Sequence, residues 1–98
     1  MTYQEVRALF QKHDDAEYLE FGRIHPDDRR HPARDICAML YLYARDDKPG
    51  EIIGAAAHDQ IVFGFNVDGC ELTEADVVYL LRCGVRYDGE TDCLMMFV

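Results

Sequence analysis

The sequence predicts one α+β domain over residues 1–98, a two-layer sandwich of antiparallel hairpins with about three helices packed on one face. Three observations lead to this fold class. Three segments carry apolar residues at helical spacing, and one segment alternates apolar with small or polar residues as a strand does. A chain of 98 residues with 49% apolar content has the size and composition of one globular core.

The first element is a helix that begins at Tyr3 and ends near His13. Thr2 and Glu5 have the spacing of a capping box, in which each side chain bonds the other residue's backbone N–H. Apolar residues along the segment share one helical face: Tyr3, Val6, Leu9 and Phe10. Residues 18–24 follow with strand-like side chains around a glycine, and we expect a short strand there.

The second helix is predicted over Ala33–Arg45, after a polar loop at residues 25–32. Pro32 suits the first turn of a helix, because its φ is already helical and its missing N–H needs no partner. The segment is rich in Ala, Leu and Met and is apolar around most of its circumference. We therefore expect the central buried helix here.

Residues 51–67 predict a β-hairpin. Apolar residues at every second position of its second half indicate a strand with one buried face: Ile61, Phe63, Phe65 and Val67. The partner strand is Ile52–Ala57, and the chain turns at His58 and Asp59. Three consecutive alanines are poor strand formers, so a loop is the alternative for the partner.

The third helix repeats the capping pattern of the first, with Thr73 as the cap and Asp76 at the third helical position. Gly84 stands where the end of a helix favours left-handed backbone. Two short strands, Val85–Tyr87 and Cys93–Val98, then flank a turn at residues 88–92.

The net charge is −9 and is concentrated in the second half of the chain. Residues 49–98 contain nine acids and only two arginines. Such a surface repels phosphates, which argues against direct nucleic-acid binding and favours a protein partner with a basic surface. The residues assigned to this interaction are Asp68, Glu71, Glu74, Asp76, Asp88, Glu90 and Asp92. Helix starts and turns also favour acids, and a charged surface aids solubility, so structural roles are the alternative.

Catalytic chemistry has little support in the sequence. The chain contains no serine, and its four cysteines lack Cys-x-x-Cys spacing, so we expect buried free thiols and no disulfide, metal site or cofactor. Cys70, beside Asp68-Gly69, is expected to be the most exposed thiol. No segment has the length of a membrane span, and the start does not resemble a secretory signal, which predicts a cytoplasmic protein.

A second hypothesis is an enzyme or anion-ligand binder that uses the Arg23–Asp35 loop with His58 and Asp59. Guanidinium groups bind carboxylate and phosphate in bidentate geometry, and a helix start adds to the attraction. The anion-binding residues would be Arg29, Arg30 and Arg34, and His25 and His31 would have to share a pocket with His58.

A third hypothesis is a homodimer. Exposed edge strands pair readily with a second chain. The apolar residues Met95, Met96 and Phe97 would contribute to such a dimer sheet.

Three segments, Leu72–Asp88, Asp92–Val98 and His31–Ala38, resemble small proteins encoded by bacteriophages and prophages. The resemblance implies a bacterial or phage cytoplasmic setting, and it brings no known activity and no site residues. It suggests a phage accessory protein, one version of which inhibits a host defence system by mimicking nucleic-acid charge.

Overall fold

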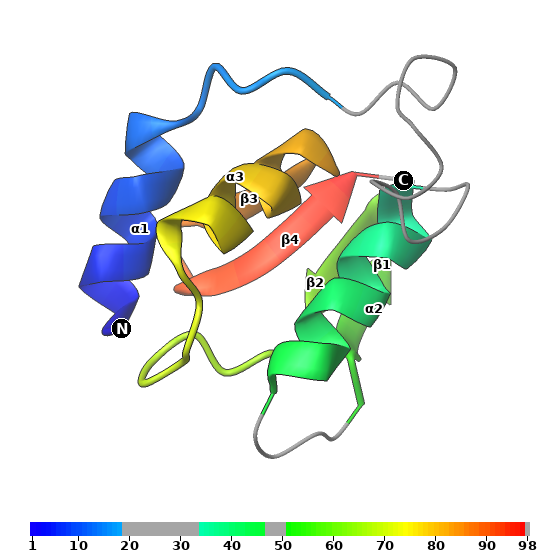
Figure 1. Cartoon of the computed structure of the whole chain (residues 1–98). Coiled ribbons are helices and arrows are strands. Elements are labelled where there is room, and N and C mark those ends of the chain that lie inside the picture. Colours follow the sequence, from blue (N-terminus) through cyan, green and yellow to red (C-terminus); the bar gives the residue numbers. More distant parts are fainter. Residues whose placement is uncertain (19–33, 47–50, 98) are drawn as a thin grey trace.

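The computed structural model describes residues 1–18, 34–46 and 51–97. Within these ranges the chain forms three helices and one four-stranded sheet. The elements in chain order are α1 (Tyr3–Lys12), α2 (Arg34–Arg45), β1 (Ile53–Ala57), β2 (Gln60–Phe63), α3 (Glu74–Arg82), β3 (Val85–Asp88) and β4 (Cys93–Phe97). The predicted α+β fold class is confirmed (Figure 1).

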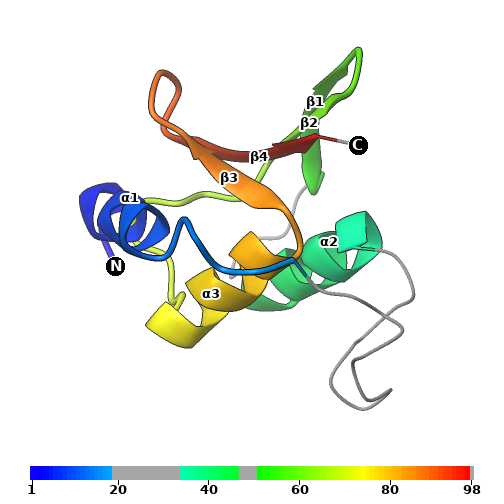
Figure 2. The ribbon, with the colours of Figure 1, turned by 90° about the horizontal axis from the view of Figure 1, so that it is seen from above.

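The sheet has the order β1-β2-β4-β3, and every neighbouring pair is antiparallel. Two hairpins, β1–β2 and β3–β4, are therefore joined through the inner pair, where Ile61 lies opposite Met96. All three helices lie on one side of this sheet (Figure 2). The core forms between the two layers, and its side chains come from both of them.

Capping explains where α1 and α3 begin. Thr2 caps α1 and Thr73 caps α3, and in both cases a complete capping box is present. His13 ends α1, as predicted, and Gly84 follows α3 with a φ of +93°, which a glycine adopts without strain.

The second helix is confirmed, but the prediction that it is buried on most sides is wrong. Cys37, Ala38 and Leu42 are completely buried against the core, whereas Leu40 is 50% and Tyr43 is 54% exposed. The helix lies at the side of the helical layer, so it buries one face only (Figure 1). None of the helices in the described ranges combines the length and the apolar character that crossing a membrane requires.

The hairpin at residues 53–63 is confirmed, with the β1–β2 turn at His58 and Asp59. The strand β2 ends at Phe63, earlier than the alternating pattern suggested. Phe65 and Val67 are nevertheless buried, so the alternation of burial continues past the end of the ladder. Of the strand expected at residues 18–24, Tyr18 is in no strand and the remainder lies outside the described residues.

The C-terminal strand β4 lies inside the sheet, whereas pairing with a second chain would require a strand at the edge. It pairs with β2 on one side and β3 on the other, so β1 and β3 are the edges of the sheet that the described residues form. Met95 and Met96 are buried, and only Phe97 of the three apolar residues is exposed. Any pairing of this sheet with a second copy would therefore use β1 or β3.

Gly64, just after β2, is a position where a side chain does not fit. Its N–H donates to the Ile52 carbonyl at 2.8 Å, and an added Cβ would overlap the Glu51 carbonyl oxygen. We expect Gly64→Ala to lower the free energy of unfolding by about 1–3 kcal/mol, because the hairpin backbone must shift. Urea unfolding measures this, with the neighbouring exposed position Asn66→Ala as the control. Equal stability of the two variants would contradict the packing described.

Candidate functional site

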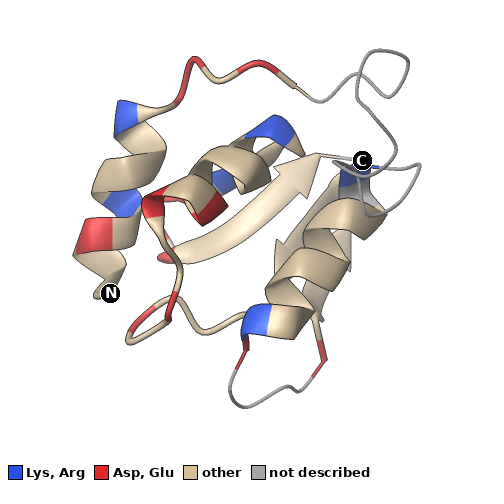
Figure 3. Ribbon diagram, in the orientation of Figure 1, with Lys and Arg blue, Asp and Glu red and all other residues tan. Residues whose placement is uncertain are grey.

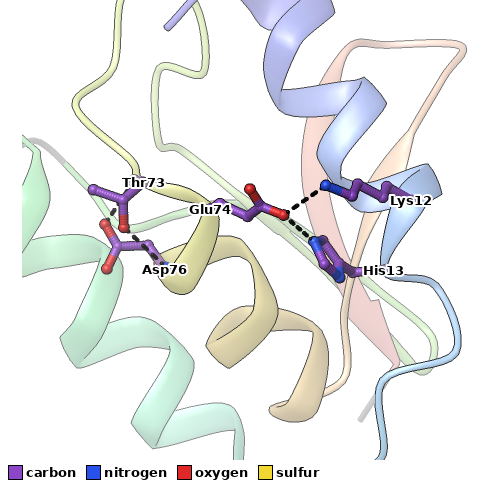
Figure 4. Close-up of polar contacts among 5 residues, drawn as sticks. All are labelled: Lys12, His13, Thr73, Glu74 and Asp76. Carbon is purple, nitrogen blue, oxygen red and sulfur yellow. Dashed lines mark hydrogen bonds and ion pairs between the residues drawn. The ribbon is translucent and has the colours of Figure 1, made fainter.

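The exposed carboxylate of Glu74 links the start of α3 to the end of α1 through polar contacts. Its Oε2 lies 3.0 Å from Lys12 Nζ and also contacts Nε2 of His13 (Figure 4). The hydrogen bond from His13, followed by the one from Lys12, holds the pKa of the Glu74 carboxyl below its usual value. This predicted partner-binding residue is therefore already paired with Lys12, a cation of the same chain.

Asp76 is only 8% exposed, which is unsuitable for the partner-binding role predicted from the sequence. Its carboxylate accepts the Thr73 backbone N–H at 2.9 Å (Figure 4). It also accepts the hydroxyl of Tyr41 and lies 3.1 Å from Arg45 Nε. Burial tends to raise its pKa, but the bonds from Tyr41 and Thr73 and the charge of Arg45 outweigh burial and lower it. Asp76 thus joins the start of α3 to the end of α2.

Two acidic residues of the β3–β4 turn form hydrogen bonds within this hairpin. Asp88 accepts the Glu90 backbone N–H at 3.0 Å and the Thr91 hydroxyl at 2.9 Å, and the first of these bonds is the main reason that its pKa is lowered. Asp92 has a φ of +54° and accepts the Tyr87 hydroxyl at 2.9 Å. Glu90 is exposed. Structural roles therefore account for Asp88 and Asp92, as the alternative interpretation expected.

Asp68 and Glu71 differ from the other acids. Both are exposed, and neither forms an ion pair with a cation in the described part of the chain. They lie at a recess of about 90 Å³ whose lining consists of Arg45, Asp46, Phe65, Asn66, Asp68, Gly69, Cys70 and Glu71. Its lining residues come from the end of α2 and from the loop before α3. Acidic residues predominate along the ribbon at this end of the molecule (Figure 3).

The chain's own N-terminus holds this loop in place. The Gly69 N–H donates to the Met1 carbonyl at 2.8 Å, and the Met1 amine donates to the Cys70 carbonyl. Gly69 has a φ of +76°, which turns Cys70 inward while Asp68 and Glu71 stay outside. The prediction that Cys70 is the most exposed thiol is therefore wrong, because Cys70 is buried and Cys93 is the more exposed.

The structure describes only some of the residues that the anion-binding hypothesis requires. Arg34 is exposed at the start of α2, with its Cζ 4.9 Å from the centre of the Tyr18 ring. His58 is exposed at the β1–β2 turn, and Asp59 is exposed next to it. The other members of the hypothesis lie outside the described residues: His25, Arg29, Arg30 and His31. Sequence reasoning did not single out Tyr18 or Arg86, which lie beside Arg34 in space.

The buried thiol of Cys83 is poorly suited to nucleophilic chemistry. Burial, and then the nearby Cys37, raises the pKa of the Cys83 thiol to about 12, so it stays protonated at neutral pH. In the described ranges, no three His, Cys, Asp or Glu side chains come together in a group that could hold a metal ion. The recess can bind a ligand through charge and hydrogen bonding, from three carboxylates, one amide and the guanidinium of Arg45.

Comparisons with protein-family models, with curated proteins and with solved structures find no match to this chain.

Proposed function

We propose that this chain is a non-enzymatic binding protein that docks its acidic recess on a basic protein surface. The recess accommodates the end of one lysine or arginine side chain from the partner, with Asp68 and Glu71 as its acceptors. One observation carries the proposal. These two carboxylates are exposed at a recess and lack an ion pair in the described ranges, whereas Glu74 and Asp76 are bound to cations of the chain itself.

The charge at the recess supports a cationic partner group. Arg45 also lines the recess, but it is bound to Asp76 and its Cζ lies only 3.4 Å from the centre of the Tyr41 ring. Its charge is therefore already paired with the Asp76 carboxylate. A guanidinium or ammonium entering the recess gains charge-assisted hydrogen bonds with little rearrangement of the loop, because the N-terminus already holds that loop.

The setting of this interaction follows from the sequence resemblance and is part of the proposal. A cytoplasmic phage accessory protein that covers the nucleic-acid-binding surface of a host defence protein would need such an acidic face. The same recess would serve for any partner whose basic surface presents a protruding cation.

The experiment compares two variants with the same change in net charge. Asp68→Asn with Glu71→Gln removes the recess carboxylates and keeps an acceptor for the Tyr3 N–H, which Asp68 accepts at 3.3 Å. Asp14→Asn with Asp15→Asn removes two exposed carboxylates at the other end of α1. Wild type and both variants are used to capture partners from bacterial lysate, and the affinity for each captured protein is measured after purification.

We expect the recess variant to bind its partner about tenfold more weakly than wild type does, and the Asp14/Asp15 variant to bind within about twofold of wild type. The wild-type affinity should also fall as salt rises, because exposed charges are screened. The proposal is wrong if both variants lose affinity equally, or if lysate contains no partner whose binding is sensitive to salt.

A further inference from the structure

A second pocket, of about 220 Å³, lies where α2 begins and α3 ends. It is lined by Tyr18, Arg34, Gly84, Arg86, Met96 and Phe97, together with the protonated thiol of Cys83. The acidic recess, in contrast, adjoins the end of α2 and the loop before α3, so the two sites lie at opposite ends of these helices (Figure 3). The pocket's chemistry is therefore independent of the proposed partner-binding surface.

Two guanidinium groups lie near the ring of one tyrosine in this pocket. The Cζ atoms of Arg34 and Arg86 lie 4.9 and 5.2 Å from the centre of the Tyr18 ring. Arg86 also donates to the Tyr18 hydroxyl at 2.6 Å and to the Val85 carbonyl at 3.1 Å. Tyr18 thus lies within cation–π distance of two like charges, and an anion that contacts both guanidinium groups would be attracted by each of them.

These cations have no carboxylate partner in the described ranges, although the chain has a net charge of −9. Arg34 and Arg86 retain N–H donors that neither the ring nor the carbonyl uses. A third arginine, Arg82, ends α3 nearby and donates its Nε to the Glu17 carbonyl at 3.2 Å. Three arginines of the described ranges thus gather where α3 ends and α2 begins.

The remaining lining is apolar. Met96 is buried at the inner side of β4, and Phe97 is 60% exposed at the pocket. Gly84 has no side chain to narrow the space. Pockets for drug-sized ligands measure roughly 300–1,000 Å³, so this one suits a smaller molecule, of about one ring.

We propose that this pocket binds a small molecule in which a carboxylate or phosphate group is attached to a compact apolar body. The oxyanion lies between Arg34 and Arg86 and accepts their N–H groups, and the Tyr18 hydroxyl, which accepts from Arg86, donates its own proton to the same oxyanion. The apolar body packs on Met96 and Phe97. These donors include no histidine, so the proposed site does not depend on His58.

The test uses benzoate and phenyl phosphate as probes, with benzyl alcohol and inorganic phosphate as probes that lack one half of the recognised chemistry. Binding is followed by amide chemical shifts in two-dimensional NMR spectra. We expect saturable shifts at Tyr18, Gly84 and Arg86 with the first two probes, and the tighter of them identifies the oxyanion. Inorganic phosphate should bind at least about tenfold more weakly than phenyl phosphate, because it lacks the apolar body.

Variants test whether the anions bind specifically in this pocket or are attracted to any exposed arginine. Arg34→Gln removes an exposed cation that forms no hydrogen bond in the described ranges, so the fold should persist. We expect it to weaken benzoate and phenyl phosphate at least about tenfold, and Arg86→Gln to do the same. Arg7→Gln, at an exposed arginine of α1, should leave both affinities unchanged. Equal binding by Arg34→Gln and wild type, equal binding of benzyl alcohol, or no saturable shift with either anion would overturn the proposal.

Discussion

Replacing Phe63 with alanine is expected to lower the free energy of unfolding by about 3–5 kcal/mol. Phe63 is the largest side chain that is almost fully buried, at 2% exposure, and it lies on the helix-facing side of β2. Removing the ring deletes apolar contact with the helical layer and leaves a cavity that the hairpin closes only in part. Since domains of this size are stable by about 5–15 kcal/mol, the loss is a large share of the total.

Phe97→Ala is the matched control, because it removes the same side chain from an exposed position of the neighbouring strand β4. We expect a change below about 1 kcal/mol there. Chemical denaturation with the same slope for both variants provides the comparison. Similar losses at the two positions would show that the layers do not pack as the structure places them.

The elements that the sequence predicted well are those decided locally. Thr2 with Glu5 and Thr73 with Asp76 specify two helix starts within four residues each, and both capping boxes are present. The alternation through Ile61 and Phe63 similarly depends only on the period of a strand. In each case the local sequence pattern is enough to specify the geometry of the element.

Burial of α2 could not be predicted in the same way. Leu40 and Tyr43 are apolar, yet they are exposed because the helix lies at the side of its layer and contacts neighbours on one face. Which face is covered depends on the order of the strands and the path of the connections, which composition does not encode. The inward turn of Cys70 likewise depends on the N-terminus, 69 residues away in sequence.

The candidate sites likewise combine features that the local sequence predicts with features that depend on tertiary contacts. The sequence singled out the acids as a group, but only tertiary contacts separate the exposed Asp68 and Glu71 from Asp76, whose partners come from another helix. Similarly, Arg34 was predicted to bind an anion, while its neighbours Tyr18 and Arg86 come from distant parts of the chain. Long-range juxtaposition, which has no short-range signature, is what the sequence could not provide.

Substituting Asp76 by alanine should lower the free energy of unfolding by about 2–4 kcal/mol at neutral pH. The change removes half of the α3 capping box, the acceptor for the Tyr41 hydroxyl, and the ionic partner of Arg45. Two helices lose their connection at once, so the loss should exceed that of an ordinary helix cap. Glu74→Gln, two residues earlier, should change stability much less, because its ion pairs are exposed to solvent.

The pH dependence of the Asp76 effect provides a second, independent measurement. The folded-state pKa of Asp76 lies below its unfolded value, so its contribution is fully present above the unfolded pKa and is lost as pH falls through the folded pKa. The stability difference between wild type and Asp76→Asn should therefore be largest near neutral pH and should shrink below about pH 4. Glu74 and Asp88 also titrate in acid, but they do so in both proteins and largely cancel in the difference. A difference that stays constant down to about pH 3 would mean that the Asp76 carboxylate is not held in its charged form by Tyr41, Thr73 and Arg45.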